Sequence, residues 1–202
     1  MQNCYLEGEI EAGIDEAGRG CLSGRVYTAA VILPEEFPDE YYLNIIDSKK
    51  LSRKKRDEVR RYIETHAIDY GVAFAEPEEI DKHNILHATI GAMHKALDEL
   101  TVLPSNIIVD GNYFKFYKDK SGEIISHQLI TGGDNKFRNI AAASILAKCN
   151  HDDYIDKLLE KNPELDKYGW STNMGYGTKA HMDAIKTHGI SKYHRKSFKP
   201  CK

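Results

Sequence analysis

A short glycine-rich segment between two apolar runs constrains this chain more than any other feature of its sequence. The segment reads Ala12-Gly13-Ile14-Asp15-Glu16-Ala17-Gly18-Arg19-Gly20 and ends in two glycines that flank one arginine. A second β-prone run follows it and is closed by Pro34. The pattern predicts two strands, over residues 8–15 and 25–33, joined as a hairpin through the glycine-rich turn.

This arrangement puts two adjacent carboxylates, Asp15 and Glu16, where one strand turns toward the next. Glycine leaves the neighbouring backbone open to a ligand, because it carries no side chain. A polar turn or a solvated strand end explains a carboxylate pair equally well when the segment is taken alone. The choice therefore depends on the other acids of the chain.

Strand-like and helical runs alternate along the rest of the sequence. Strands are predicted by short apolar runs, at residues 70–75, 107–109 and 124–130. Helices are predicted by apolar residues three and four positions apart, over residues 53–66, 78–100, 135–161 and 178–187. This order predicts an α/β class with an antiparallel opening hairpin. We expect a single domain over residues 1–202, with a C-terminal loop and helical extension over about 162–202.

The composition argues against several classes of protein. The net charge of −3 excludes a uniformly basic nucleic-acid coat, so such binding has to come from local patches. The four cysteines are widely spaced and form no C-x-x-C pair, which favours neither a zinc site nor a disulfide framework. The chain shows no signal peptide and no run long enough to span a membrane. We expect a soluble cytoplasmic protein, and nothing in the sequence demands more than a monomer.

Three aspartates share one local context. Asp15 and Asp110 follow apolar strand runs, and Asp134 follows a strand and a Gly-Gly turn at the start of a helix. Sites in open α/β sheets form outside the strand ends, so these residues and Glu16 are expected to converge. Four carboxylates repel one another unless a cation offsets their charge. Oxygen ligands without Cys or His favour Mg²⁺ or Mn²⁺ over Zn²⁺.

Two such ions, about 3.5–4 Å apart, would activate a water and stabilise the leaving oxygen of a phosphodiester. Sequence spacing alone does not establish that the acids converge. Asp134 is also well placed to be the N-cap of a helix, and Asp110 to be a turn residue before Gly111. Both alternatives stay open on the sequence.

The chain also carries an ordered set of motifs. They are Gly13-Ile14-Asp15-Glu16-Ala17-Gly18-Arg19-Gly20, Asp47-Ser48-Lys49-Lys50-Leu51-Ser52, Asn84-Ile85-Leu86-His87-Ala88-Thr89, Val109-Asp110-Gly111-Asn112, Gly133-Asp134, Ala141-Ala142-Ala143-Ser144-Ile145-Leu146-Ala147-Lys148, Gly175-Tyr176-Gly177-Thr178 and Tyr193-His194-Arg195. With these motifs the chain resembles ribonuclease HII, the type 2 ribonuclease H family, over essentially residues 8 to 198. One motif would be suggestive, whereas the full set in this order is highly specific.

The resemblance implies an RNase H-like fold, a mixed five-stranded sheet flanked by helices, with a C-terminal helical extension. It implies a metal-dependent endonuclease that cuts the RNA strand of RNA/DNA hybrids and nicks duplex DNA on the 5′ side of an embedded ribonucleotide. The products would carry a 3′-hydroxyl and a 5′-phosphate. Carried over position by position, the acids that would bind two Mg²⁺ or Mn²⁺ ions and act in catalysis are Asp15, Glu16, Asp110 and Asp134.

The resemblance also implies which residues contact the substrate. The backbone of Gly18, Arg19 and Gly20 would sense the 2′-hydroxyl, the one sugar group that separates RNA from DNA. Tyr176 would pack on the adjoining deoxyribose, although a loop aromatic that covers core is the alternative. Phosphate contacts are expected from the matched block that contains Ser48, Lys49 and Lys50.

The chain departs from the family pattern at four positions near these motifs. Cys21 and Arg25 stand where proline is common, and Gly132 and Met174 replace frequent lysines. The acids are intact, so we expect activity, and the loss of two charges bears on phosphate affinity and its salt dependence.

Two other functions remain to be separated from this one. Ribonuclease HIII shares the acidic set but prefers continuous RNA, and it usually has an extra N-terminal domain for which the residues before Asp15 leave no room. A hybrid-binding module that has lost its chemistry is the other. The four intact acids argue against such a module.

Overall fold

Six strands form one mixed sheet in the computed structural model, which describes all 202 residues. The strands are β1 (Glu11–Ala17), β2 (Val26–Ile32), β3 (Asp69–Ala75), β4 (Asn106–Asp110), β5 (Tyr117–Lys118) and β6 (Ile124–Ile130). Their order across the sheet is β3-β2-β1-β4-β6-β5. The β1–β4 and β4–β6 pairs are parallel, and the other three pairs are antiparallel.

The predicted α/β class and opening hairpin are confirmed, but the count of five strands was one short. The additional strand, β5, has only two residues and pairs with the start of β6 at the edge of the sheet. A two-residue strand carries no alternation of apolar and polar residues, so no periodic signal marked it.

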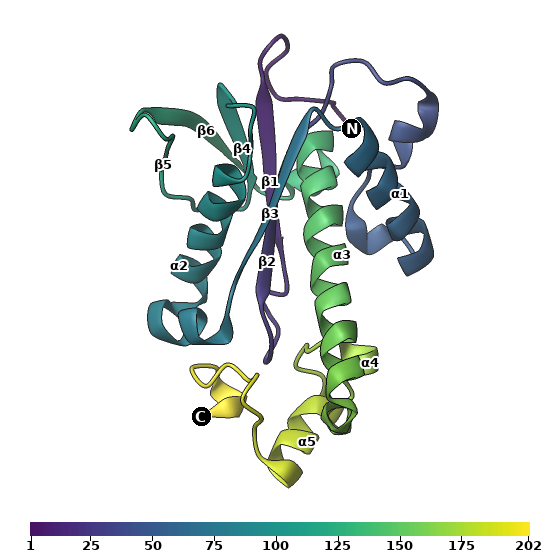
Figure 1. The fold of residues 1–202 in the computed structure, drawn as a ribbon, viewed down its shortest axis with the longest axis vertical. Coiled ribbons are helices and arrows are strands. Elements are labelled where there is room, and N and C mark those ends of the chain that lie inside the picture. Colours follow the sequence, from purple (N-terminus) through teal and green to yellow (C-terminus); the bar gives the residue numbers. More distant parts are fainter.

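The chain forms five α-helices and several short 3₁₀ turns. They are α1 (Arg53–His66), α2 (Pro77–Asp98), α3 (Arg138–Lys161), α4 (Trp170–Asn173) and α5 (Lys179–His188). Helix α2 covers one face of the sheet, while α1 and α3 cover the other (Figure 1). None of these helices is long and apolar enough to cross a membrane.

The two faces of β1 contribute to two separate hydrophobic cores. Successive side chains of a strand point to opposite faces. Ala12 and Ile14 therefore pack with α2, whereas Ala17 packs with α3. Gly13 lies on the α3 side, and a Cβ placed on it would come 2.3 Å from the backbone of Asn139. Glycine at this position lets α3 lie directly on the strand that carries Asp15.

Residues 162–202 pack beneath the turn that joins β1 to β2 (Figure 1). Leu22, from the glycine-rich turn, belongs to the same buried cluster as Trp170 and Ile185. The stretch expected to be loop, 162–177, contains a 3₁₀ turn over Pro163–Tyr168 and the short helix α4. Gly169 joins these two turns at a φ of +70°, which is why no continuous helical pattern was visible.

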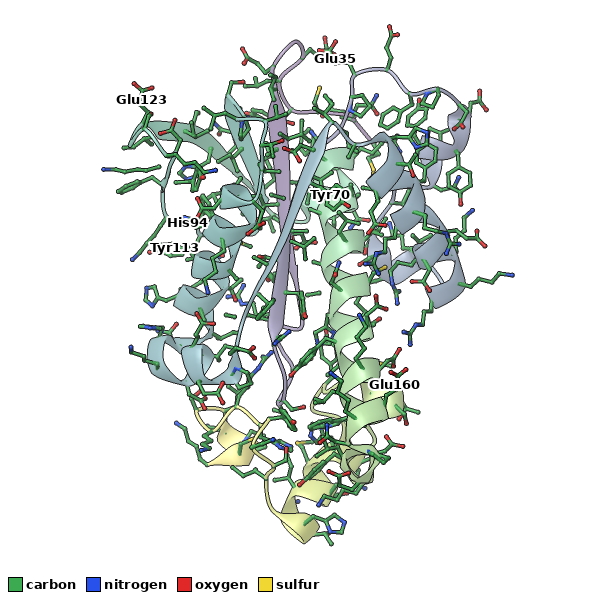
Figure 2. All side chains as sticks on the ribbon, viewed as in Figure 1. Glu35, Tyr70, His94, Tyr113, Glu123 and Glu160 are labelled. Atoms are coloured by element: carbon green, nitrogen blue, oxygen red, sulfur yellow. The ribbon has the colours of Figure 1, made fainter.

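Side chains fill the spaces between the sheet and its helices (Figure 2). The charged residues labelled there, Glu35, Glu123 and Glu160, lie exposed at the outside of the molecule. The buried acids described next are therefore exceptions to the general distribution of charge.

Candidate active site

Asp15 and Asp110 lie side by side on the two central parallel strands. Ile14 of β1 is opposite Val109 of β4, so the next residue along each strand is one of the two aspartates. Asp15 lies inside β1, which continues to Ala17, rather than in the turn after a strand as expected. The convergence of these two acids follows from the strand register.

Asp134 reaches the same place through a short turn after β6. Ile130, the last residue of β6, is opposite Asp110. The amide of Gly133 then donates to Asp110 Oδ1 at 2.7 Å, which ties the turn that carries Asp134 to the end of β4. The N-cap of α3 is Phe137 rather than Asp134, so the N-cap alternative for Asp134 is wrong.

The acids are buried enough to perturb one another. Asp15 is 5% exposed and Asp134 is 4% exposed. Burial, with the nearby charges of Glu16 and Asp110, raises the pKa of Asp15 well above its usual range. Burial also raises the pKa of Asp110, with a further increase from Asp134, against the lowering by the Gly133 amide. A cation among these groups would offset the repulsion that adds to burial in raising both pKa values.

Glu16 completes the set of four acids at the beginning of the glycine-rich turn. Burial raises the pKa of Glu16, and the nearby charge of Arg19 opposes this effect. Arg19 Nη1 lies 3.4 Å from Glu16 Oε1. This contact joins the acidic site to the segment predicted to read the 2′-hydroxyl.

Lys49 provides a second side-chain cation beside the four acids, in addition to Arg19. Its Nζ lies 3.6 Å from Asp134 Oδ2, while the side chain is 80% exposed. Burial lowers the pKa of Lys49, but Asp134 and three other acids outweigh it, so the net shift is upward. The Lys49 ammonium therefore stays protonated and positively charged beside the four acids.

Two residues that were not among the predicted site residues, Asp47 and Asn135, hold the short turn that contains Lys49 against the acidic site. Asp47 accepts the amide of Lys49 at 3.0 Å and the side-chain amide of Asn135 at 3.4 Å. Asn135 Nδ2 also donates to Asp134 Oδ1 at 3.0 Å. Asp47 begins a matched motif and precedes a 3₁₀ turn, and this position was the available signal.

The other two residues of that motif that were expected to contact phosphate, Ser48 and Lys50, differ in exposure. Lys50 is exposed and donates to Asn135 Oδ1. Ser48 is 4% exposed, and its hydroxyl lies 3.0 Å from that of Ser144 on α3. This structure gives Ser48 a supporting position, and the substrate contact predicted for it stays a prediction.

The donor set fits a hard divalent cation, although it is not closed around one. The four acids offer only carboxylate oxygens, which suit Mg²⁺ or Mn²⁺. No group of three or more His, Cys, Asp or Glu side chains is arranged as a ready-made metal centre. A place for positive charge is indicated by the arrangement of the carboxylates, because Asp15 and Asp110 follow paired residues on adjacent strands and Asp134 lies close enough to Asp110 to help raise its pKa.

The glycine-rich turn requires glycine for two separate reasons at Gly18. Its φ is +81°, and a Cβ there would come 2.4 Å from the ring of His151 on α3. Gly20 faces the other predicted reader, since a Cβ on it would lie 3.9 Å from Tyr176 Cε1. A backbone bridge between Cys21 and Tyr176 holds the two segments together.

Tyr176 is only partly covered by its neighbours, with 37% of its surface exposed. Lys148 Nζ lies 5.5 Å from the centre of its ring, and burial raises the pKa of its hydroxyl to about 12. The ring is therefore un-ionised at neutral pH and presents a face beside the turn. A residue that only covers core would be expected to be more deeply buried.

The departures from the family pattern are accommodated without strain at Arg25 and with some at Met174. Arg25 pairs with Glu76 at 2.6 Å and lies over the ring of Phe74 at 3.8 Å. Met174 adopts a φ of +49°, a left-handed conformation that is uncommon for a residue with a side chain. Gly132 has a φ of +65° and open space around it.

Comparison with known proteins adds independent findings. The family model for ribonuclease HII matches residues 12–201. Ribonuclease HII of Parabacteroides distasonis is 52% identical over 195 residues, which cover 96% of this chain and 92% of that protein. The ribonuclease HII of Bacteroides fragilis is 51% identical over 94% of this chain and 89% of its own.

Solved structures agree with the architecture. The ribonuclease H2 from Pyrococcus horikoshii superimposes with a TM-score of 0.75 at 25% identity, covering 95% of this chain and 94% of its own. Bst-RNase HIII in complex with Mn²⁺ gives a TM-score of 0.71 at 18% identity, covering 98% of this chain and 69% of its own. The expected RNase H-like fold is therefore confirmed.

Proposed function

Because this chain belongs to the ribonuclease HII family, a family of hydrolytic nucleases with ribonuclease H activity on RNA/DNA hybrids, we propose that it also nicks duplex DNA on the 5′ side of an embedded ribonucleotide. The products would be a 3′-hydroxyl and a 5′-phosphate. Removal of ribonucleotides left in DNA would begin with this nick.

One observation carries the proposal. The backbone bridge between Cys21 and Tyr176 puts the glycine-rich turn and an exposed tyrosine ring side by side, and Arg19 joins that turn to Glu16. The 2′-hydroxyl is the only group on the sugar by which a protein can tell RNA from DNA. A ring on the neighbouring sugar would favour a bare deoxyribose. Together they could recognise an RNA–DNA junction next to the acids.

The chemistry would fall to the acidic site. Asp15, Glu16, Asp110 and Asp134 would hold two divalent ions, which when bound would supply an activated water and charge stabilisation at the leaving oxygen. Raised carboxylate pKa values and oxygen-only donors support Mg²⁺ or Mn²⁺, and the related HIII structure contains Mn²⁺. Lys49 and Lys50, both exposed beside the site, would contact backbone phosphates.

All of these residues come from one chain, which supports a monomer as the working unit. Substrates would be RNA/DNA hybrids and DNA duplexes that contain ribonucleotides. With Lys49 and Lys50 as the proposed phosphate contacts, binding should weaken with salt in proportion to the number of lysines involved.

The test compares three labelled duplexes that share one sequence. The labelled strand contains one ribonucleotide in the first, four in the second, and ribonucleotides throughout in the third. We expect a Mg²⁺- or Mn²⁺-dependent nick 5′ of the single ribonucleotide. Cutting of the continuous hybrid without the single-ribonucleotide substrate would instead indicate the specificity of ribonuclease HIII. Binding of all three without cutting would indicate a module that has lost its chemistry.

A further inference from the structure

Arg195 is the largest buried charge that the proposed chemistry does not use. Its side chain is fully buried, and all of its guanidinium hydrogen bonds go to backbone carbonyls. Burial lowers the pKa of its guanidinium, whose central carbon lies 5.3 Å from the centre of the Phe198 ring. An unpaired buried cation is costly, so its partners need explanation.

Those partners are four backbone carbonyls of the glycine-rich turn. The guanidinium donates to Gly18 O at 2.8 Å and to Arg19 O at 3.0 Å. It also donates to Gly24 O at 2.9 Å and to Arg25 O at 3.0 Å. One side chain from the C-terminal extension thus holds both ends of the turn between β1 and β2.

These hydrogen bonds fix which way the turn's amides point. All peptide bonds here are trans and planar, so a carbonyl and the following N–H point in opposite directions. Since the carbonyls of Gly18 and Arg19 point inward to Arg195, the amides of Arg19 and Gly20 point away from it. Neither amide donates to another group of the protein, and both residues are exposed.

We propose that Arg195 is a positioning residue for ribonucleotide recognition, which holds the peptide planes at Gly18–Gly20 so that the amides of Arg19 and Gly20 face the substrate. This inference rests on the proposed function of the turn. If Arg195 has this role, the C-terminal extension takes part in substrate recognition. The extension also pairs with the turn directly, since the Arg195 amide donates to Leu22 O at 2.8 Å. Loss of the guanidinium frees the planes to rotate and weakens selection for the 2′-hydroxyl more than it weakens cutting itself.

The experiment measures kcat/KM for Arg195→Ala and Arg195→Lys on the one-ribonucleotide duplex and on the continuous hybrid. A continuous hybrid offers many registers and many 2′-hydroxyls, so it tolerates a loosened turn better. We expect the kcat/KM for the one-ribonucleotide duplex, divided by that for the continuous hybrid, to fall about 10-fold or more in Arg195→Ala. Lysine has no fork with which to bind several carbonyls, so Arg195→Lys should restore little of the ratio. Millimolar guanidinium should restore part of the ratio in Arg195→Ala.

The matched control is Arg138→Ala. Arg138 is also buried, and its guanidinium donates to the carbonyls of Tyr42 at 3.1 Å and Ile45 at 3.3 Å, away from the turn. It should lose stability without a change in the substrate ratio, and guanidinium should not alter its ratio.

An Arg195→Ala enzyme that is folded and keeps the wild-type ratio would overturn the inference, as would a fall in both activities by the same factor. Should Arg195→Ala not fold, the ratio for Arg195→Lys decides in the same way. If the wild type itself ignores the single ribonucleotide, the proposed function has failed instead.

Discussion

Gly18 is the residue at which the fold and the proposed chemistry constrain each other most closely. Its left-handed φ turns the chain out of β1, and its missing side chain leaves room for the ring of His151. His151 is in turn held by the carboxylate of Asp152, 3.2 Å from Nδ1, so the ring cannot easily move away. The turn that follows the acids is therefore shaped by α3 from behind.

We predict that Gly18→Ala lowers stability by about 2–4 kcal/mol, which combines backbone strain at positive φ with a steric clash against His151. Nicking should fall with it. Gly122→Ala is the matched control, because Gly122 has a φ of +90° with nothing within 4 Å. It should lose only the backbone part, about 1 kcal/mol. Urea unfolding of both variants makes the comparison, and equal losses would contradict the clash.

At the scale of single elements, the sequence predicted whether almost every segment is a helix or a strand. It did not predict the short turns and kinks at which these elements begin or bend. Strand β6 was predicted over its observed residues because its run is bounded by turn signals. Helix α3 begins at Arg138, three residues after the expected start, because a 3₁₀ turn over Gly133–Asn135 intervenes. Local hydrophobic periodicity predicts a helix or a strand, whereas the turns that connect them depend on contacts with distant strands.

The joint inside α2 explains the motif that begins at Asn84. This residue has a φ of +63°, and its Oδ1 accepts the amide of His87 at 3.2 Å, so the helix restarts there with a side-chain cap. No sequence pattern revealed this kink, because apolar spacing continues on both sides of it.

We predict that Asn84→Ala destabilises the protein by about 1–2 kcal/mol, since it loses the cap and keeps an unfavourable φ. Asn84→Gly should be milder, within about 0.5 kcal/mol of wild type, because glycine accepts the positive φ and caps adequately. Thermal unfolding of both variants tests this. Equal destabilisation by the two substitutions would show that φ plays no part.

At the scale of the whole molecule, a buried histidine pair couples the extension to the site. His181 Nδ1 lies 2.9 Å from Tyr176 O, and its Nε2 lies 3.1 Å from His194 Nε2. Trp170 Nε1 donates to the same Nε2 of His181 at 3.2 Å. These contacts are all satisfied when His181 carries its proton on Nδ1 and His194 on Nε2, so both rings are neutral.

Stability should therefore fall in mild acid. Burial and the neighbouring His181 lower the pKa of His194 to about 4, from an ordinary 6.5. The unfolded chain takes up the proton first, so this contribution is complete above about pH 6.5 and is lost as the pH falls toward 4. We expect a loss of about 2 kcal/mol over that window.

Urea unfolding at several pH values should show a shallower dependence for His194→Gln than for wild type. The paired comparison cancels the acids of the site, whose raised pKa values act in the opposite direction. His188→Gln, at an exposed position of α5, should follow the wild-type curve. A His194→Gln curve parallel to wild type would contradict the assignment.

The positions of the four acids were predicted from sequence because they recur at strand ends and in specific motifs. Their docking was not predicted, since Asp47 and Asn135 contact each other across 88 residues of sequence. Arg195 likewise acts on a turn 170 to 177 residues away. Such contacts have no local signature.

The assignment of the four acids is best tested by measuring how Asp110→Asn nicks a one-ribonucleotide DNA duplex in Mg²⁺ or Mn²⁺. Asparagine can still accept the Gly133 amide and removes a charge that Asp134 repels, so the variant should be as stable as wild type or more so. We predict that nicking falls by about 100-fold or more and that added Mn²⁺ no longer raises the melting temperature. Asp183→Asn, on the exposed side of α5, should behave as wild type. Wild-type nicking by a folded Asp110→Asn would contradict the central claim that these acids form the metal-binding active site.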